Sequence, residues 1–255
     1  MSRSTGLCLA AACLLPLSAQ ARDAQQAVVN RLQLSAEHNR LDRGLDDWNE
    51  VTLRYSRQWQ RREVAEVALT EARRFGLADR QLEATYVRPL GPRLTASAQL
   101  WFSPEHRFLA RHAVEAGAQY EFQPAWLLHA RLRKASYDTA SVAQGTLMLE
   151  RYAGDYSASL AWRPVRALGT SADGFELRAN RYYGDDSHVG LIASSSREAT
   201  PLGGGRIVLA DVRSVALTGR HRVGPGWSLT YALHRTRQGS FYSRTGLSAG
   251  AQHDF

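Results

Sequence analysis

The stretch LTASAQLWF (Leu94–Phe102) decides the fold, because apolar and polar residues alternate along almost its whole length. A second stretch, VEAGAQYEF (Val114–Phe122), alternates in the same way. Successive side chains of an extended chain point to opposite faces, so each stretch predicts a β-strand with one apolar and one polar face. Nine residues in one register are enough for a tilted strand to cross a membrane.

The same alternation recurs almost to the C-terminus, in fourteen segments. Their apolar stripes run through residues 32–36, 51–59, 65–69, 82–86, 94–102, 114–122, 126–132, 147–149, 156–162, 175–179, 189–193, 215–217, 227–233 and 247–255. The third, eighth and twelfth segments are the weakest, so twelve or sixteen strands stay open. We predict an all-β fold, an antiparallel up-and-down transmembrane β-barrel of fourteen strands, in which every second residue faces lipid.

The connections between these segments alternate in length, as an up-and-down barrel requires. Short turn-forming links lie at Gly91-Pro92, Gln123-Pro124, Ala153-Gly154-Asp155, Gly184-Asp185-Asp186 and Gly224-Pro225-Gly226. Longer polar links span residues 38–47, 75–80, 103–111, 166–174, 197–206 and 238–243. With both termini in the periplasm, we expect the short links to face the periplasm and the long links to face outward, which makes the strand number even.

The N-terminal residues predict export. Arg3 precedes a short apolar core, Leu7–Leu17, and the small-x-small sequence Ala19-Gln20-Ala21 follows as a cleavage site. We therefore expect a signal peptide over residues 1–21 and a mature chain that begins at Arg22. An uncleaved membrane anchor is the alternative, but this apolar core is shorter than a bilayer-spanning helix.

The domain division follows from this cleavage site. We expect a short periplasmic segment over residues 22–30 and the barrel over residues 31–255. Cys8 and Cys13 both lie in the signal peptide, so the mature chain is expected to have no cysteine. That excludes disulfides, cysteine nucleophiles and cysteine metal sites.

Composition alone fits a soluble β-sandwich as well as a barrel. The chain has 32 basic and 24 acidic residues, a net charge of +8, and no stretch after the signal peptide approaches the length of a membrane helix. The strand faces decide between the two folds, because Arg131 and Arg133 oppose an apolar stripe. In a dry sandwich core each unpaired ion costs several kcal/mol, whereas a wet lumen removes most of that penalty. The arginines are spread along the chain, so we expect no nucleic-acid binding.

Aromatic residues concentrate near the ends of the predicted strands, where they are expected to form two interfacial girdles. These residues are Trp59, Tyr86, Phe102, Tyr120, Phe122, Trp126, Tyr156, Trp162, Phe175 and Trp227. The C-terminus, Ser248-x-Gly250-x-x-His253-x-Phe255, has the pattern of the last strand that the barrel-assembly machinery recognises. We expect Gly250 and Phe255 to act as this assembly signal, although His253 replaces the usual hydrophobic residue.

Several motifs make the sequence similar to a known family. They are Asp47-Trp48, Leu53-Arg54-Tyr55-Ser56-Arg57, Arg74-Phe75-Gly76-Leu77-x-Asp79-x-Gln81-Leu82-Glu83, Ser103-Pro104, Arg181-Tyr182-Tyr183-Gly184-Asp185 and the terminal Phe255. The chain resembles the YaiO family of outer-membrane β-barrel proteins over nearly all of its mature length, from about Arg31 onward. The resemblance implies the cell outer membrane of a Gram-negative bacterium and, for some members, a link with surface-polysaccharide export. The periplasmic repeat region that precedes some barrels of the family is not found here.

No enzyme motif is found in the sequence. There is no nucleophile elbow, no metal-binding histidine pair, no Walker loop and no dinucleotide fingerprint. His129 is expected to form hydrogen bonds in the lumen, and Asp155, Asp185 and Asp186 are expected to form turns and not a calcium site. We predict no enzymatic activity, no cofactor and no metal.

The residues opposite the apolar stripes are expected to line the lumen and to discriminate between solutes. They are Arg54, Glu66, Glu83, Glu115, Glu121, Arg131, Arg133, Glu150, Arg163, Glu176, Arg178, Arg220 and Arg222. Trp101, Tyr152 and Tyr182 share this face and are candidates for stacking on a glycan.

These residues favour a channel or export conduit for polar solutes or an extended surface glycan. The alternatives are a structural or surface-interaction barrel with a plugged lumen and, less favoured, a lipid-modifying outer-membrane enzyme. The expected partners are outer-membrane lipid and lipopolysaccharide, the barrel-assembly machinery and a polysaccharide.

Overall fold

The computed structural model describes residues 28–74, 76–138, 140–167, 169–202 and 206–255, so the expected signal peptide lies outside the described residues. The strands are β1 (Val29–Leu41), β2 (Trp48–Gln60), β3 (Glu63–Arg74), β4 (Leu77–Pro89), β5 (Leu94–Phe102), β6 (His112–Gln123), β7 (Trp126–Ser136), β8 (Ser141–Ala153), β9 (Tyr156–Trp162), β10 (Val165–Ala167), β11 (Thr170–Ala172), β12 (Gly174–Tyr183), β13 (Ser187–Leu202), β14 (Arg206–Gly224), β15 (Trp227–Gln238) and β16 (Tyr242–Asp254). No helix in these ranges is long and apolar enough to cross a membrane.

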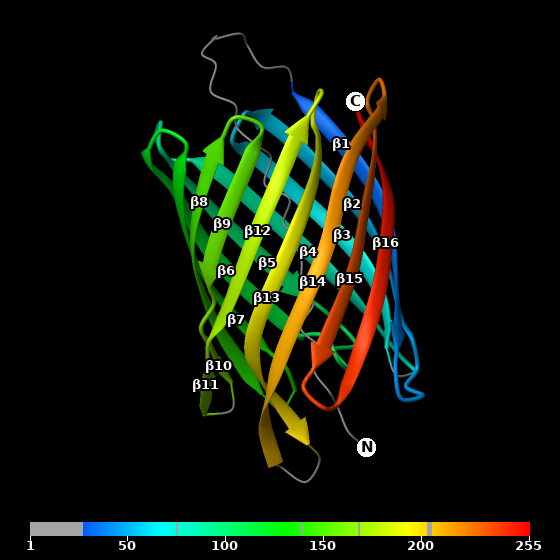
Figure 1. Ribbon diagram of the computed structural model, residues 1–255. Helices are drawn as coiled ribbons and strands as arrows, with labels where there is room; N and C mark the ends of the chain where they lie inside the picture. Colours follow the sequence, from blue (N-terminus) through cyan, green and yellow to red (C-terminus); the bar gives the residue numbers. More distant parts are fainter. Residues whose placement is uncertain (1–27, 75, 139, 168, 203–205) are drawn as a thin grey trace.

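The strands close into a single barrel (Figure 1). Each strand from β1 to β9 pairs antiparallel with the next, β9 pairs with β12, and β12 to β16 continue the wall. β1 then pairs with β16 and completes a wall of fourteen strands. The predicted fold is confirmed, and the three weakest segments are the strands β3, β8 and β14.

Alternation of side chains explains why these segments form a barrel wall. Outward residues are apolar and exposed, as in Leu132 (75 % exposed) and Leu34 (57 %). Inward residues are polar and mostly buried or half-buried, as in His129 (2 %) and Gln252 (5 %). A closed antiparallel wall satisfies the backbone of every strand without leaving an open edge, which is what a bilayer requires.

The two ends of the barrel differ. At one end, where the C-terminus also lies (Figure 1), short turns join the strands. Gly226 has a φ of 71° in the β14–β15 turn, and an added Cβ would lie 2.7 Å from the carbonyl oxygen of Asp254. We call this end the turn end and the opposite end the loop end.

Four of the predicted connections at the loop end differ from the structure in their bounds. The predicted link over residues 75–80 is wrong, because β3 runs to Arg74, β4 starts at Leu77, and Gly76 (φ 73°) allows a tight turn. The predicted link 197–206 is also too long, since β13 continues to Leu202 and β14 begins at Arg206. The link 38–47 shortens to residues 42–47, because β1 extends to Leu41. The link 238–243 shortens to residues 239–241, because β15 runs to Gln238 and β16 begins at Tyr242. Polarity misled the prediction, since strands that project beyond an apolar band are polar on both faces.

One hairpin of the wall is interrupted near the loop end. β10 continues the pairing of β9 along β8, and β11 returns beside β10 before β12 begins. Arg163 and Gly174 exchange backbone hydrogen bonds of 2.8 and 3.1 Å across the interruption. The expected loop 166–174 therefore contains two short strands that lengthen the wall locally.

Outward aromatic side chains lie near both ends of the strands. Those near the turn end are Tyr55, Trp59, Tyr86, Tyr120, Phe122, Trp126, Tyr156, Tyr183, Trp227 and Phe255, and those near the loop end are Phe102, Trp162 and Phe175. His253 packs between Trp227 and Phe255, at centroid distances of 4.5 and 5.8 Å, so it belongs to the aromatic group despite its polarity. These two groups bracket the apolar band of the wall.

Candidate functional site: the inner wall of the barrel

The inner wall carries charged clusters that the strand register assembles. On β2 to β4, the guanidinium of Arg54 bonds to the Glu66 carboxylate and lies 3.7 Å from Glu83. Glu83 also accepts hydrogen bonds from Gln99 Nε2 at 2.6 Å and from Trp101 Nε1 at 3.1 Å. Several hydrogen-bond donors offset the cost of removing a carboxylate from water, so this cluster fixes part of the wall.

A second cluster centres on Glu176 of β12. Its side chain is 3 % exposed and accepts from Arg163 Nη1 at 2.7 Å and from Arg178 Nε at 2.5 Å. One carboxylate between two guanidiniums leaves the cluster with a net positive charge. On β6 and β7, Arg131 Nη1 lies 3.9 Å from Glu115, which adds a looser pair to the same wall.

Two further groups lie toward the turn end. His129 Nε2 is 3.0 Å from Glu150, and the rings of Tyr152 and Tyr182 stack with centroids 6.2 Å apart. The other group lies at the seam between β1 and β16. There Asp254 binds Arg31 at 2.8 Å and lies 3.9 Å from Arg220.

These clusters run along the wall and not across the lumen. Arg178 and Glu176 lie on the same strand, β12, and Arg163 directly follows β9, the neighbour of β12. Every other ion pair named above joins strands that are neighbours or next neighbours in the wall. The side chains of Arg54, Arg131 and Arg178 keep 31 %, 28 % and 27 % of their surface accessible. Groups paired along a wall and still accessible are arranged to interact with water or a solute in the lumen.

Two of the predicted lumen residues, Glu121 and Arg222, lie at the ends of their strands, next to turns. Glu121 Oε1 accepts the backbone N–H of Ala125 at 3.3 Å, so it holds the β6–β7 turn. Arg222 is exposed at the end of β14, next to the bulge between Arg222 and Gly224. The other eleven residues are buried or half-buried; ten lie on the inner face of their strands, and Arg163 directly follows β9.

The three aromatic candidates for glycan stacking differ in accessibility. Trp101 is 5 % exposed, its ring is covered by Arg133 at 4.3 Å, and it packs with Ala110. That ring is therefore part of the wall. Tyr152 and Tyr182 are only half-buried, so they remain placed toward the lumen.

The expected assembly residues lie at the seam that closes the barrel. Phe255 exchanges backbone hydrogen bonds with Asn30 at 2.8 and 2.9 Å. A Cβ on Gly250 would lie 2.8 Å from Thr230 Oγ1 and 2.9 Å from Ser35 Cβ, so glycine allows β1 and β15 side chains to approach β16.

The loop over residues 103–111 folds against the inner wall, which the sequence did not predict. Asp79, 1 % exposed, accepts the backbone N–H groups of Arg107, Phe108 and Leu109 at 3.0, 2.8 and 2.8 Å. Phe108 and Leu109 pack on Ala72, which lies on the inner face of β3. Asp79 falls within the predicted link 75–80, so the sequence pattern does not indicate its inward position on β4.

An aromatic and arginine cluster adjoins this loop at the loop end. Arg74 lies over the rings of Phe108 and Trp48 at 5.2 and 4.8 Å, and Arg244 lies over Trp48 at 4.9 Å. Trp48 and Tyr242 meet edge to face at 6.0 Å. The mouth is therefore lined by packed side chains that join β2, β3, β16 and the loop.

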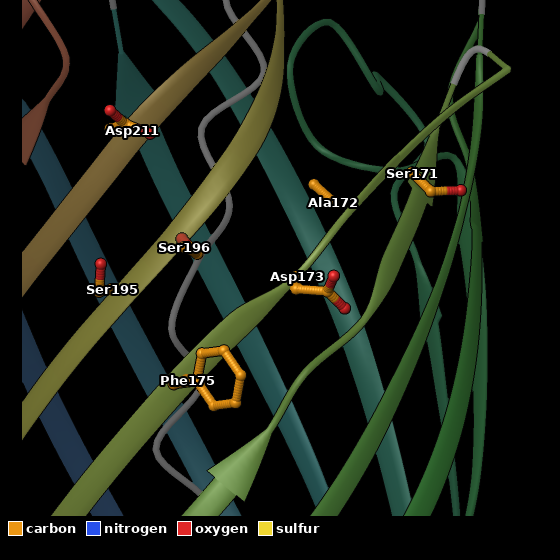
Figure 2. A pocket seen from close by; sticks show the side chains of 7 residues that line it. All are labelled: Ser171, Ala172, Asp173, Phe175, Ser195, Ser196 and Asp211. Carbon is orange, nitrogen blue, oxygen red and sulfur yellow. The ribbon is translucent and has the colours of Figure 1, made fainter.

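A shallow hollow of about 360 Å³ lies on the wall near the start of β12. Figure 2 shows its lining residues, which are Ser171, Ala172, Asp173, Phe175, Ser195, Ser196 and Asp211. Within the described ranges, no three His, Cys, Asp or Glu side chains are grouped to hold a metal ion.

Comparison with solved structures places this architecture among outer-membrane barrels. CymD, a monoaromatic hydrocarbon channel, is 9 % identical with a TM-score of 0.59, covering 91 % of this chain and 88 % of CymD. A structure described as a bacterial polysaccharide outer membrane secretin is 10 % identical with a TM-score of 0.59, covering 91 % of this chain and 99 % of the other. An anion-selective porin from Comamonas acidovorans is 11 % identical with a TM-score of 0.50, covering 90 % and 99 %.

Comparison of sequences gives the family. No curated protein matches the chain significantly. The model of the YaiO membrane beta barrel domain matches residues 29–199, which span β1 to most of β13. The chain is thus an outer-membrane β-barrel that belongs to the YaiO membrane beta barrel family.

Proposed function

We propose that this barrel is a non-enzymatic conduit that carries polar solutes or an extended glycan across the outer membrane. The accessible charged inner wall is the observation that carries this proposal. Side chains of both signs are paired along the wall, and Arg54, Arg163 and Arg178 each keep more than a quarter of their surface accessible. An apolar or fully packed interior offers no such path for polar solutes.

The solved barrels support transport as a use of this fold. One is named as a channel, one as a porin and one as a polysaccharide outer membrane secretin. Their identities of 9–11 % restrict the likeness to the fold, so the substrate has to be argued from this chain's own residues.

The inner wall favours hydrophilic cargo. Arg163 and Arg178 flank one carboxylate, which leaves positive charge beside the path, whereas Glu66 and Glu83 share Arg54 and leave negative charge. A wall with both signs orients water and interacts with hydroxyl groups. The half-buried pair Tyr152 and Tyr182 adds aromatic surface of the kind on which sugar rings stack.

A closed interaction barrel is the second candidate, and the loop over residues 103–111 favours it. Phe108 and Leu109 occupy space beside the inner wall, and Arg74 ties the loop to Trp48. In that case the long β13–β14 hairpin would serve as the contact surface and the lumen would stay closed.

Planar-bilayer recordings of the refolded barrel test the proposal. We expect discrete steady conductance steps in potassium chloride, and a reduction of ionic current when a soluble polysaccharide is added. Boiled protein in the same detergent is the control. Absence of steps at all voltages, from protein that migrates as a folded barrel on unheated gels, would refute the conduit and favour the closed barrel.

A further inference from the structure

Four arginines gather on the outer face of the barrel at the loop end. Arg213 of β14 lies directly opposite Arg237 of β15. Arg235, two residues before Arg237, is opposite Val215 on one side and Thr245 on the other. Thr245 is in turn opposite Arg40 of β1, so the cluster extends over four adjacent strands.

The side chains of this cluster are exposed and mostly without a charged partner. All four are exposed, and among the ion pairs of the described residues none includes Arg40, Arg213 or Arg235. Arg237 Nε donates to the carbonyl oxygen of Gly239 at 3.3 Å. Like charges placed directly opposite on two strands repel each other, so this arrangement favours an anion between them.

The flanking carboxylates do not offset the four charges. Asp211 lies on the same face of β14, two residues before Arg213, and has its own interaction. Asp42 Oδ1 accepts the backbone N–H of Ser243 at 2.8 Å. Four guanidiniums face two carboxylates, which leaves a net positive patch.

Another pair of outward arginines at the same end differs because each arginine has an ion-pair partner. Arg73 Nη2 lies 2.9 Å from Glu71, and Arg80 Nε lies 3.9 Å from the same side chain. Both groups are therefore exposed at the loop end. They differ in pairing, since Arg73 and Arg80 each lie within ion-pair distance of Glu71, whereas no ion pair of the described residues includes Arg40, Arg213 or Arg235.

The cluster lies at the edge of the apolar band. Val215, Leu233 and Leu247 are outward and 54 %, 49 % and 57 % exposed, and the arginines follow them toward the loop end. At this height the acyl chains of a membrane give way to headgroups. A lipid whose headgroup contacts these guanidiniums would therefore lay its acyl chains against Val215, Leu233 and Leu247.

We propose that Arg40, Arg213, Arg235 and Arg237 form a binding site for the phosphate groups of a membrane lipid, and specifically for the phosphorylated headgroup of lipid A. Guanidinium groups bind phosphate oxygens through paired hydrogen bonds, which lysine cannot reproduce. The four arginines extend over four strands, so a headgroup with two separated phosphates can contact more of them than a headgroup with one phosphate. The site lies on the outer face, so it is independent of conduction through the lumen.

Lipid binding to the refolded barrel in detergent tests this site. The probe is bis-phosphorylated lipid A, titrated against intact protein and followed by native mass spectrometry, with fully dephosphorylated lipid A in a parallel arm. Each basic side chain near a lipid surface contributes about a fivefold gain in affinity, so R213Q/R237Q is expected to lose about 25-fold. The matched control is R73Q/R80Q, which is expected to bind as the unchanged protein does.

The other arms separate charge from geometry and from misfolding. R213K/R237K keeps the charge and is expected to recover only part of the affinity, because the paired hydrogen bonds are lost. Two affinities are compared: that of dephosphorylated lipid A for the unchanged protein, and that of bis-phosphorylated lipid A for R213Q/R237Q. The first is expected to be no higher than the second. Equal binding of both lipids, or equal losses in R213Q/R237Q and R73Q/R80Q, would overturn the proposal. Unheated gels confirm that each variant is folded.

Discussion

The loop over residues 103–111 offers a sharp test of how the mouth of the barrel is held. Asp79 is buried on β4 and accepts three consecutive backbone N–H groups, those of Arg107, Phe108 and Leu109. Oδ2 receives two of them at 2.8 Å and Oδ1 receives the third at 3.0 Å. We predict that Asp79→Asn releases this loop from the inner wall.

The magnitude follows from the hydrogen bonds that asparagine can keep. Its carbonyl oxygen can occupy the position of Oδ2, but its NH2 group then faces the N–H of Arg107, donor to donor. One hydrogen bond to a charged acceptor contributes about 1.5–3 kcal/mol. Loss of one such bond is therefore expected to raise the detached fraction of the loop about 10- to 150-fold.

A thiol at position 110 reports this detachment. Ala110 is 4 % exposed and packs in the cluster with Trp101, Ala113 and Ala135, so Ala110→Cys is shielded while the loop is attached. Cys8 and Cys13 are the two natural cysteines, and both precede Arg22, so the protein refolded from Arg22 onward carries this single thiol. The measurement is the rate at which a polar maleimide labels it, with and without Asp79→Asn.

A second carboxylate provides the control. Glu105 Oε2 accepts the N–H of Arg80 at 3.1 Å and leaves the three bonds of Asp79 intact. Glu105→Gln is expected to change the labelling rate less than about threefold, since an exposed hydrogen bond contributes little. If Asp79→Asn labels no faster than Glu105→Gln, the Asp79 carboxylate does not hold the loop.

Two further predictions concern the wall itself. Glu176→Gln leaves Arg163 and Arg178 without the carboxylate they share. Because water reaches both guanidiniums, we expect the free energy of unfolding, measured with urea in detergent, to fall by about 2 kcal/mol, less than for a fully buried pair. The reversal potential of the channel is expected to shift toward anion selectivity. An unchanged urea midpoint would show that this cluster does not stabilise the wall. Gly219→Ala places a Cβ 2.4 Å from the Tyr231 ring and is expected to destabilise by about 1–3 kcal/mol. Gly224→Ala, where nothing lies within 4 Å, serves as its control, and equal urea midpoints for the two variants would contradict the close contact.

Much of the fold could be predicted from local patterns. The alternation in Leu94–Phe102 gives the two faces of a strand, because side-chain direction depends only on neighbouring backbone geometry. For the same reason the alternation places Arg131 and Glu176 on the inner face. Loop boundaries were less predictable at residues 75–80, since polar strand ends and polar loops have the same composition.

The contacts of the site needed the tertiary structure. Parity places Arg54 and Glu83 on one face, but only the pairing of β2, β3 and β4 brings them within 3.7 Å. The direction of the loop held by Asp79 likewise depends on residues about 30 positions away in sequence.

The sequence by itself therefore determined the class of fold, the fourteen segments and the faces of their residues, because these follow from a period of two along each strand. Only the tertiary structure decided which charges meet, that the loop over residues 103–111 turns inward, and that Arg213 stands opposite Arg237. The physical reason is register. The height of one strand against the next is set by hydrogen bonds between distant segments, and a pattern within one segment contains no information about that height.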